Sequence, residues 1–458
     1  MNINELYLNI NTPGFDTLVC QTEIKTLDDI KKYNNKGYLI QDTLEEFKKK
    51  YTIDPECVWY GSGIGLQCIY FNRKTFATLN IQYISFADIS ADFIKQMYYE
   101  IERAEKEVAN NNYWLSFLSL NDKMKLELLE MLVKERADKI PDLYSLWYSI
   151  YTSTDYGFND IDKAIIDRIL QSKTDEEKAE TNNALSNLPD EITVYRGGNS
   201  ESTDYRDAYS WSLNPNVANF FAIRRGNGPA YIAKGTVSKK DIIEYLADTD
   251  CEDEIIIYPD KIKDIEYNEL PGMEFIKDLM PFVVNDYKKY RDILVNEVSS
   301  YGNDNDVHGK EHSARVLLLC LLLAEYLGLP ASDKRILGTA AIYHDSMREN
   351  DYNDSLHGKR AGEYYASVSK KIDPIVQFLC EYHCLPDEEG YAEIKRNRKL
   401  SKRRDHTILL YQIFKDADGL DRVRLGNIKN EMDLAQYRLP ITKDLTFVAK
   451  LICDNIKL

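Results

Sequence analysis

The order of apolar and polar residues divides the chain into stretches with different expected secondary structure. Up to about residue 90 the pattern is mixed, and β-branched and aromatic residues concentrate in segments 67–71 and 77–86, which indicates strands. From about residue 92 to residue 188, apolar residues recur with the spacing of amphipathic helices. Short β-rich runs return within 192–267, and the chain after about residue 273 again has helical spacing. The pattern predicts a multi-domain α+β protein.

Local signals mark some of the expected boundaries. Thr174 precedes acidic residues, with Glu177 three positions later, which is the sequence pattern of a helix start closed by a capping box. The glycine-rich stretch 61–65 fits neither a dinucleotide fingerprint nor a P-loop, so a tight turn is expected there. We expect three parts, namely a mixed α/β region without an assigned role at 1–90, a domain with a preceding helical lobe at 91–272, and an all-α domain at 273–458.

Composition places the chain among folded proteins with several domains. Its 458 residues are 44% hydrophobic and 29% charged, which supplies enough apolar material for cores and argues against wholesale disorder. The formal charge of −17 argues against a general nucleic-acid coat, because such coats are basic. The longest unbroken apolar run, 316–324, is far too short to span a bilayer, and the first residues do not resemble a signal peptide. We therefore expect a cytoplasmic protein without a membrane partner.

The eight cysteines are scattered along the chain and form no CxxC pair. Because the length does not suit a small disulfide scaffold, reduced thiols are the simplest expectation. Cys380 and Cys384 flank His383, an arrangement that suits zinc, but no second ligand pair of that kind follows. We expect these two cysteines to be buried or incidental.

Three elements between residues 190 and 260 carry residue types that suit the cleavage of an N-glycosidic bond. Arg196 ends an expected strand before two glycines, where its planar fork suits a diphosphate. Glu252 and Glu254 stand at the start of an apolar run, and a fixed carboxylate stabilises an oxocarbenium-like transition state. Ser210 and Ser212 could orient that carboxylate or a ribose hydroxyl. Taken singly, each residue also suits a plain structural role at a strand end, a turn or a solvated edge.

In combination, these residues make the segment 190–268 resemble the mono-ADP-ribosyltransferases of the arginine–serine–glutamate type. The resemblance implies a split β-sandwich that holds NAD in a cleft, with the preceding helical stretch as its α-helical lobe. It implies that Arg196 binds the NAD phosphates and that Ser210 and Ser212 lie at the NAD site, with Ser210 on the nicotinamide-ribose side. Phe221 could stack on nicotinamide, although core packing is the alternative.

The same resemblance assigns the chemistry to two acidic residues. Glu254 would be the catalytic glutamate, supported by Ser210, and Glu252 would match the first acid of the family's E-x-E form, which helps to activate or select the acceptor. The middle motif of the family is often Ser-Thr-Ser, and Trp211 stands here in place of the threonine. The acceptor of ADP-ribose, a protein side chain or a nucleic acid, is left open.

A second group of candidate residues lies in the last third of the chain, which holds all six histidines. His308 and His312 lie four residues apart on one expected helical face, and later segments add further nitrogen and carboxylate groups. Helical bundles build divalent metal sites from donors that converge from several helices. The candidate ligands are His312, His344, Asp345, His357, His383 and Asp418. His406 is expected to be a surface or packing residue.

This order of residues makes the segment 277–440 resemble the HD-domain metal-dependent phosphohydrolases. The ligands of a divalent metal implied by the resemblance are His312, His344, Asp345 and Asp418, with Mn, Fe, Mg and Zn not distinguished. His357 and His383 would complete a second metal site or bind the substrate phosphate. His312 is preferred to His308 because the first helix of the family commonly reads H-x-x-R-V.

These observations predict an NAD-consuming ADP-ribosyltransferase joined to an HD phosphohydrolase, and by analogy a toxin or phage-defence effector. Seven of the ten residues 395–404 are basic, and this segment could hold a nucleotide or another polyanion or form a solvated helix face. Two alternatives remain open. In one, only the HD phosphohydrolase is catalytic and a degenerate NAD or ADP-ribose sensor regulates it. In the other, the HD block is a nucleotide-binding module that switches the transferase.

Overall fold

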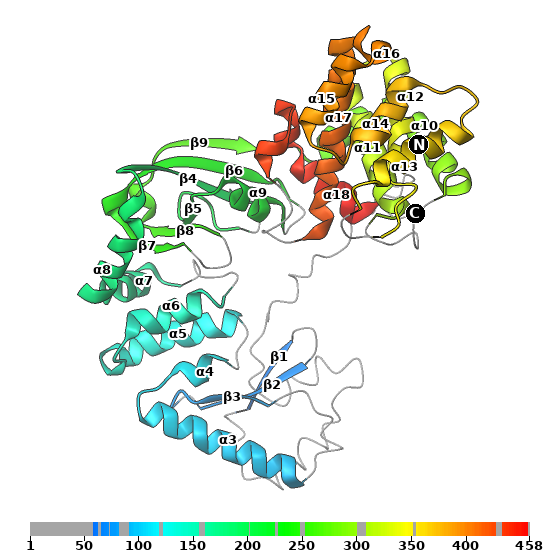
Figure 1. The fold of residues 1–458 in the computed structure, drawn as a ribbon. Coiled ribbons are helices and arrows are strands. Elements are labelled where there is room, and N and C mark those ends of the chain that lie inside the picture. Colours follow the sequence, from blue (N-terminus) through cyan, green and yellow to red (C-terminus); the bar gives the residue numbers. More distant parts are fainter. Residues whose placement is uncertain are drawn as a thin grey trace. The chain divides into compact units, whose positions relative to one another are not determined.

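The computed structural model divides into two compact units (Figure 1). The smaller unit comprises Pro13–Leu188 and Ile243–Tyr245, and the larger unit comprises Met1–Thr12, Pro189–Ile242 and Leu246–Leu458. The structure describes residues 58–62, 66–72, 74–81, 91–118, 122–154, 161–200, 202–224, 228–247, 252–299, 308–350, 354–426 and 433–456.

The described part of the smaller unit contains a three-stranded antiparallel sheet followed by helices. Its strands are β1 (Val58–Ser62), β2 (Leu66–Phe71) and β3 (Thr78–Ile81). Its helices are α3 (Ala91–Ala109), α4 (Trp114–Leu118), α5 (Asp122–Arg136), α6 (Leu143–Tyr151), α7 (Lys163–Gln171) and α8 (Asp175–Ala184). The expected strand at 67–71 and the helical stretch are confirmed, and the strand expected at 77–86 is observed at 78–81. Residues 63–65 of the expected glycine turn and residues 82–86 lie outside the described part of the chain.

A buried ion pair stabilises the helical part of the smaller unit. Lys173 Nζ lies 2.7 Å from Glu244 Oε2, and the two side chains are only 3% and 11% exposed. Glu244 also accepts hydrogen bonds from the Tyr144 hydroxyl at 2.7 Å and from the Thr181 hydroxyl at 2.6 Å. Burial raises the pKa of the Glu244 carboxyl, but the bonds from Lys173, Thr181 and Tyr144 outweigh burial and lower it. The carboxylate is therefore satisfied without water.

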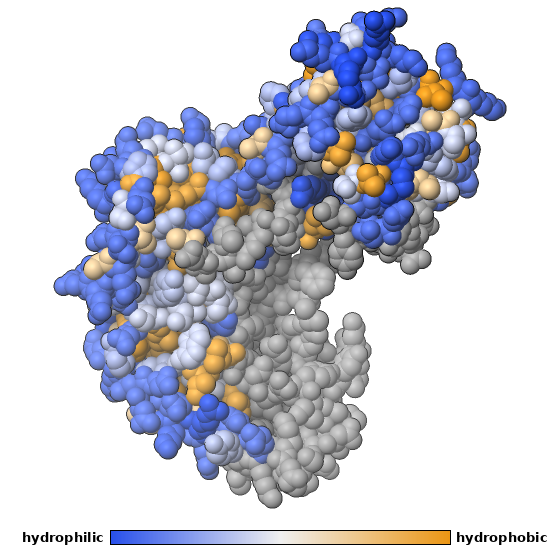
Figure 2. Space-filling model, viewed as in Figure 1, coloured by the Kyte–Doolittle hydropathy of each residue, from blue (hydrophilic) through white to orange (hydrophobic). Residues whose placement is uncertain are grey.

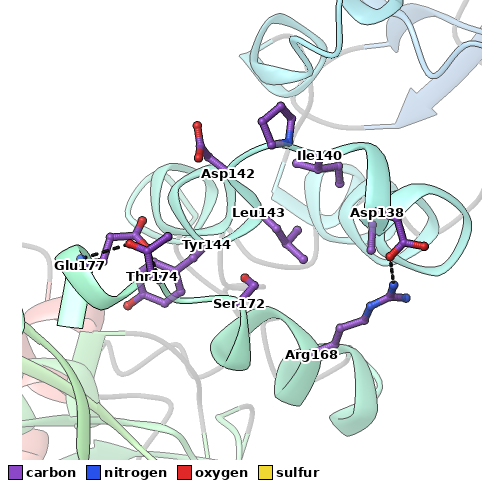
Figure 3. Close-up of a pocket in the computed structure, with 11 residues that line it drawn as sticks. Asp138, Ile140, Asp142, Leu143, Tyr144, Arg168, Ser172, Thr174 and Glu177 are labelled. Carbon is purple, nitrogen blue, oxygen red and sulfur yellow. Dashed lines mark hydrogen bonds and ion pairs between the residues drawn. The ribbon is translucent and has the colours of Figure 1, made fainter.

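Figure 3 shows a pocket of the smaller unit that is lined by residues of α6, α7 and α8 and by the segment after α5. At one end Arg168 Nη2 donates to Asp138 Oδ1 at 2.9 Å. At the other end Thr174 and Glu177 form a capping box at the start of α8, which confirms the helix start expected from the sequence. Arg168, Asp138 and Glu177 thus all bind residues of the pocket wall, which indicates that these contacts hold the helices together.

The chain then forms a six-stranded sheet with the order β7-β8-β5-β4-β6-β9, which belongs to the larger unit except for residues 243–245 of β7. Every register pair that the structure defines in this sheet is antiparallel. The strands are β4 (Glu191–Gly198), β5 (Ser210–Ser212), β6 (Tyr231–Ser238), β7 (Ile242–Leu246), β8 (Glu254–Ile257) and β9 (Lys263–Glu269). They account for the β-rich runs expected within 192–267. The six strands β4 to β9 form one sheet, so the expected split β-sandwich is not confirmed.

The helix α9 (Pro215–Arg224) lies directly against β4 because residue 197 has no side chain. A Cβ placed on Gly197 would lie 1.5 Å from the backbone oxygen of Ala218 in α9. This close approach fixes the position of the strand end that carries Arg196.

The second part of the larger unit is helical in all its described elements, as the sequence predicts. Its α-helices are α10 (Met273–Glu297), α11 (Lys310–Tyr326), α12 (Ala331–Tyr343), α13 (His357–Val368), α14 (Pro374–Tyr382), α15 (Asp387–Arg396), α16 (Arg398–Ser401), α17 (Arg404–Leu420) and α18 (Thr446–Asn455). Its 3-10 helices are η10 (Asp421–Leu425), η11 (Leu434–Gln436) and η12 (Pro440–Asp444). Every residue of α11 from His312 to Ala324 is buried, so this helix forms the centre of the bundle. Among the described helices, none is both long enough and apolar enough to cross a membrane.

One apolar core joins the sheet to the helical part of the larger unit. It includes Ala222 and Ile223 of α9 and Leu270 after β9, together with residues of α10 to α18. At the same junction, the Thr446 hydroxyl donates to Asn219 Oδ1 at 2.7 Å, and both residues are fully buried. The helix α9 is therefore packed on its sheet side and on its helical side.

Candidate metal centre and candidate NAD site

Five helical elements of the larger unit bring the candidate metal ligands together. His312 lies in the first turn of α11, and the pair His344–Asp345 directly follows α12. His357 begins α13 and His383 directly follows α14, so both lie at helix ends. Asp418 lies in the last turn of α17. Each residue thus stands at or near the end of a helix, where its side chain reaches a common centre.

All four histidines turn the same ring nitrogen toward this centre. Each Nδ1 faces an oxygen acceptor of the protein, so it carries the hydrogen and the Nε2 keeps its lone pair. The pairs are His312 Nδ1 with Asp421 Oδ2 (2.7 Å), His344 Nδ1 with Ala341 O (2.9 Å), His383 Nδ1 with Cys380 O (2.8 Å) and His357 Nδ1 with Asp354 O. The fold therefore presents four nitrogen donors.

The first donor cluster consists of His312, His344 and Asp418. The Nε2 atoms of His312 and His344 are 3.2 Å apart, and they lie 3.3 Å and 3.8 Å from Asp418 Oδ1. The two histidine side chains are buried, whereas the Asp418 side chain is 28% exposed. The open side of this cluster therefore lies at Asp418.

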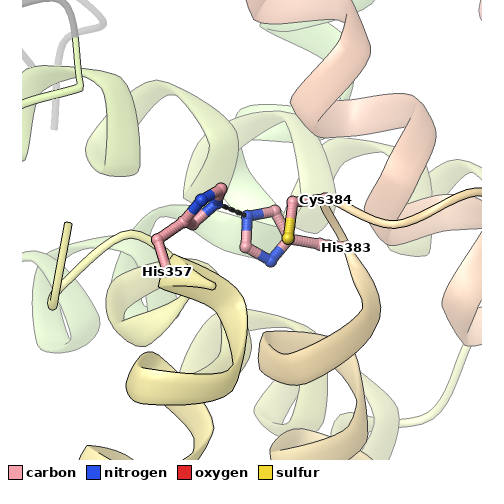
Figure 4. A group of neighbouring side chains, drawn as sticks. All are labelled: His357, His383 and Cys384. Atoms are coloured by element: carbon pink, nitrogen blue, oxygen red, sulfur yellow. Dashed lines mark hydrogen bonds between the residues drawn. The ribbon is translucent and has the colours of Figure 1, made fainter. Parts of the chain in front are cut away.

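The second donor cluster consists of His357 and His383, with Asp345 between the two clusters. The Nε2 atoms of His357 and His383 are 2.9 Å apart (Figure 4). They lie 3.2 Å and 3.4 Å from Asp345 Oδ1. The other oxygen, Asp345 Oδ2, lies 3.5 Å from His312 Nε2 in the first cluster. Asp345 thus offers one oxygen to each cluster, as a carboxylate that bridges two ions would.

The donor set fits divalent cations. Nitrogen lone pairs that face one another and carboxylate oxygens at these distances repel unless a cation or a proton lies between them. Imidazole nitrogen and carboxylate oxygen suit Zn, Fe, Mn and related ions. Three overlapping groups of side chains lie close enough to hold an ion, namely His312–His344–Asp418, His344–Asp345–His383 and His357–His383–Cys384.

Electrostatics keeps one histidine and two carboxylates of the donor clusters in the state that metal binding requires. Burial lowers the pKa of His344 to about 3, so its ring is neutral near pH 7. Burial raises the pKa of the Asp345 and Asp418 carboxyls, but the neighbouring histidines outweigh it and hold both pKa values far below the usual range. Metal ligands must be deprotonated, and these three groups already are. Burial and the Arg424 charge lower the pKa of His312, but hydrogen bonds to Asp418 and Asp421 outweigh them and raise it, so an ion must displace a proton from this ring.

His357 behaves differently in the absence of an ion. Burial lowers its pKa, but hydrogen bonding to Asp345 and Cys384 outweighs burial and raises the pKa to about 10. A proton on this ring then supplies the positive charge that the surrounding donors require.

A carboxylate behind the first cluster was not anticipated from the sequence. Asp421 accepts from His312 and also from Arg315, whose Nε and Nη2 lie 2.6 Å and 3.0 Å from its two oxygens. Arg424 adds a third contact at 3.2 Å. Asp421 thus fixes the ring of His312, and its position three residues after Asp418 is the signal that would have placed both on one side of the chain.

Residues 309–423 match the family model for the HD domain. The match covers all six predicted metal ligands and Asp421. An HD domain indicates a hydrolase that uses divalent metal, and the helical bundle fits this domain. No curated protein and no solved structure matches the chain.

The two remaining histidines lie outside the HD donor clusters. The His308 ring lies 5.9 Å from the His312 ring, at the edge of the first cluster. His406 Nε2 lies 2.7 Å from Asp333 Oδ2, which is a contact between α17 and α12. The expectation that His406 has a packing role agrees with this contact.

The sheet brings the predicted arginine, serine and glutamate of the candidate NAD site together. The strands β4, β5 and β8 are neighbours, and Arg196 Nη1 donates to the backbone oxygen of Ser210 at 2.7 Å. The Ser210 hydroxyl donates to Glu254 Oε1. All three side chains are partly exposed. Arg196 and Glu254, which are 58 positions apart in sequence, are thus linked through Ser210 on neighbouring strands.

The backbone between Glu252 and Glu254 adopts an uncommon conformation, which hydrogen bonds hold in place. Asp253, between the two glutamates, has φ of 47°, in the left-handed region that aspartate tolerates better than most residues. Ser212 donates to the Glu252 carbonyl oxygen at 2.6 Å, and Leu213 N donates to the Asp253 carbonyl oxygen at 2.9 Å. Ser212 therefore supports the glutamate turn through its backbone, and its place at an NAD site stays a prediction.

The aromatic residues near this site have separate roles. Phe221 is half-buried on α9, and the Arg224 guanidinium lies 5.3 Å from its ring centre. Trp211 is buried and donates its indole N–H to Ala208 O at 3.2 Å, so it is a core residue of β5. Stacking of Phe221 on nicotinamide stays a prediction.

The basic segment 395–404 forms the end of α15, the helix α16 and the start of α17. All seven of its basic residues are exposed. Figure 2 shows strongly hydrophilic residues gathered over the end of the HD domain where Figure 1 labels α16. A solvated helix face and a polyanion surface both agree with this exposure.

Proposed function

We propose that the HD domain hydrolyses a phosphoester with the help of two divalent cations. The observation that carries this proposal is the position of Asp345, whose two oxygens face two separate histidine clusters. Such cations, when bound, lower the pKa of a water molecule and offset the charge of a phosphate group. His312, His344 and Asp418 would hold one ion, and His357 and His383 the other.

Further residues of the chain would position the substrate. Asp418 marks the exposed side of the first cluster, so the phosphate would enter there. Arg348 Nη1 lies 3.4 Å from Asp345 Oδ1 and 3.3 Å from His357 Nε2. Its guanidinium is thus placed to donate to phosphate oxygens beside the cations.

The test is hydrolysis of phosphodiester and nucleotide substrates by the full chain after removal of metal and addition of Mn²⁺. We expect activity that requires the ion, and a loss of at least about 100-fold in Asp345→Asn, because one bridging ligand affects both ions. Asp454→Asn, which changes an exposed carboxylate on α18, is the matched control. Activity that is equal in chelated and loaded protein would refute the proposal.

A second activity is favoured by the Arg196–Ser210–Glu254 arrangement. We propose that this site transfers ADP-ribose from NAD to a macromolecular acceptor. Arg196 would bind the diphosphate, and Glu254, held by Ser210, would stabilise positive charge on the ribose as the bond to nicotinamide breaks. Nicotinamide would leave with the bonding electron pair. The acceptor would then form a bond to the ribose, with Glu252 as the group that receives its proton.

The transferase is tested by incubation of the full chain with labelled NAD and a cell lysate. We expect label on protein or nucleic acid, no label with Glu254→Gln, and unchanged labelling with Glu266→Gln, an exposed glutamate on β9. Phosphohydrolase activity that responds to NAD without labelled acceptor would instead favour a sensor that regulates the HD domain. Nucleotide binding by the HD domain without turnover would favour a switch module.

A toxin or phage-defence role is the biological context that we propose for a chain with both centres. Expression is expected to slow cell growth, and Glu254→Gln is expected to relieve this effect, because NAD consumption would stop. Growth curves of strains with matched expression levels measure it. Equal toxicity of the variant would remove the transferase from the explanation.

A further inference from the structure

We propose that Cys384 is a ligand of the second ion of the HD domain, so that the two ions differ in their chemical preference. The inference rests on the proposed two-ion centre and goes beyond it, because the resemblance to HD phosphohydrolases assigns only histidine and aspartate. The donor atoms of His357, His383 and Cys384 all lie within 4.8 Å of one another (Figure 4). Zinc binds nitrogen at about 2.0–2.1 Å and sulfur at about 2.3 Å, so small side-chain movements suffice to bring these atoms to one ion.

The backbone makes room for this sulfur. A Cβ placed on Gly358, the residue after His357, would lie 2.9 Å from Cys384 Sγ and 2.8 Å from the Cys380 carbonyl oxygen. Any larger residue at position 358 would therefore push the end of α14 away from the start of α13. The glycine brings the two helix ends together at the point where the three donors meet.

Cys384 differs from the other described thiols of the larger unit. Cys320 and Cys380 are fully buried in the apolar core, where a thiol acts as a small hydrophobic group. Cys453 is partly buried on α18, outside the groups that could hold an ion. Among these four thiols, the one that faces two histidines is Cys384.

The donor chemistry separates the two positions. His312, His344 and Asp418 offer nitrogen and oxygen, which Mn²⁺ and Fe²⁺ accept as well as Zn²⁺ does. A thiolate is a soft donor and selects Zn²⁺, or its probes Co²⁺ and Cd²⁺, over Mn²⁺ and Mg²⁺. When the ion binds, the thiol loses its proton to solvent and the Cys384 sulfur becomes a metal-bound thiolate. We therefore expect a mixed centre with a thiolate at one position.

The test is titration of the metal-free full chain with Co²⁺, followed by absorption spectroscopy. Co²⁺ bound to nitrogen and oxygen gives weak visible bands, whereas a bound thiolate adds an intense near-ultraviolet charge-transfer band. We expect two ions per chain and the charge-transfer band in the wild type. In Cys384→Ser we expect loss of that band, with the visible bands of the first ion retained. Cys453→Ser, which changes a partly buried thiol on α18, should keep the full spectrum.

The outcomes separate this inference from the proposed metal centre. No Co²⁺ bound by the HD domain would overturn both. Two bound ions with a charge-transfer band that Cys384→Ser does not reduce, or visible bands alone, would overturn the role of Cys384 and leave the metal centre intact. A single bound ion would overturn the second position itself. Because the visible bands of the first ion report a folded centre, a misfolded variant is recognised by their loss, and Cys384→Asp then replaces the serine variant with a donor that keeps charge but lacks sulfur.

Discussion

Each histidine of the HD centre uses one ring nitrogen for support and presents the other to the donor cluster. Backbone oxygens accept from three of the rings. In each case the acceptor lies three residues before the histidine, because the histidine stands at a helix end. His312 differs, because its support is the side chain of Asp421. The affinity of the first position for its ion should therefore depend on a residue that does not touch the ion.

We predict that Asp421→Asn weakens metal binding at the first position by about 10- to 100-fold, the usual effect of losing a carboxylate behind a histidine ligand. The amide cannot hold the His312 ring as a charged acceptor, and Arg315 keeps only the longer ion pair with Glu311 at 3.8 Å. Competition of the protein with a chelating indicator for Mn²⁺ measures this affinity. Asp454→Asn is again the control, and unchanged affinity in Asp421→Asn would mean that the carboxylate only stabilises the fold.

A second residue-scale prediction concerns the buried ion pair of the smaller unit. The folded pKa of Glu244 is lowered below its usual 4.5, so the pair stabilises the fold above that pH and is lost as the pH falls through the lowered pKa. Glu244→Gln should cost about 3 kcal/mol near pH 7, because Lys173 stays buried without a counter-charge.

Urea denaturation of the full chain as a function of pH measures both effects. The difference between the wild type and Glu244→Gln should shrink as the pH falls below about 4, since protonation of Glu244 removes the same interaction. Asp167→Asn, which breaks the exposed pair with Lys163, should change the free energy of unfolding by less than about 1 kcal/mol. A constant difference across the pH range would contradict the assignment.

At the scale of elements, the periodicity of the sequence was sufficient to separate helical from β-rich stretches and to place several strands, but not to divide the stretch after residue 273 into its helices. The β-rich runs became β4, β6, β8 and β9, and the helix start at Thr174 was located to the residue. Local pattern carries this information because side-chain burial repeats with the period of each element. The strand order could not be predicted in the same way, because β5 pairs with β8 across more than forty residues and no local signal records that contact.

The same limit explains what was missed at the HD centre. Order and residue type were enough to propose the six donors. The roles of Asp421 and Cys384 depend on ring orientation and on the approach of α13 to α14, which only the folded chain defines. Cys384 was accordingly expected to be incidental.

The contact of α9 with β4 yields an element-scale prediction. Gly197→Ala should destabilise the larger unit by at least about 1–3 kcal/mol, because the new methyl group overlaps the α9 backbone. Thr193→Ala, at an exposed position of the same strand, should cost less than about 1 kcal/mol. Thermal unfolding of the purified full chain compares the two. Equal effects would show that the close packing of α9 on β4 does not stabilise the fold.

At the scale of the whole molecule, the larger unit contains two candidate centres and one continuous core. The helix α9 begins three residues after Ser212 and packs against α18, and α18 in turn contacts η10, which carries Asp421. A contiguous set of packed elements therefore runs from the candidate NAD site to the HD centre. Spatial continuity alone is no proof of coupling, so the contact must be measured.

We predict a coupling energy of about 1 kcal/mol between Asn219 and Thr446, the size of one buried neutral hydrogen bond. A double-mutant cycle with Asn219→Ala and Thr446→Val, read by urea denaturation, isolates this contribution. The exposed pair Lys450–Asp454 provides the control cycle, for which less than about 0.5 kcal/mol is expected. A coupling energy near zero between Asn219 and Thr446 would mean that this hydrogen bond does not help to join the two parts of the larger unit.

The shared core has a consequence for how the gene can be divided. A fragment that starts at α10 would leave the Thr446 hydroxyl without its acceptor and uncover the apolar residues that Ala222, Ile223 and Leu270 protect. A fragment that ends before α10 would expose those same three residues to water and would tend to aggregate. Recombination or cloning can therefore transfer the sheet and the bundle intact only as one piece. That piece contains both candidate centres.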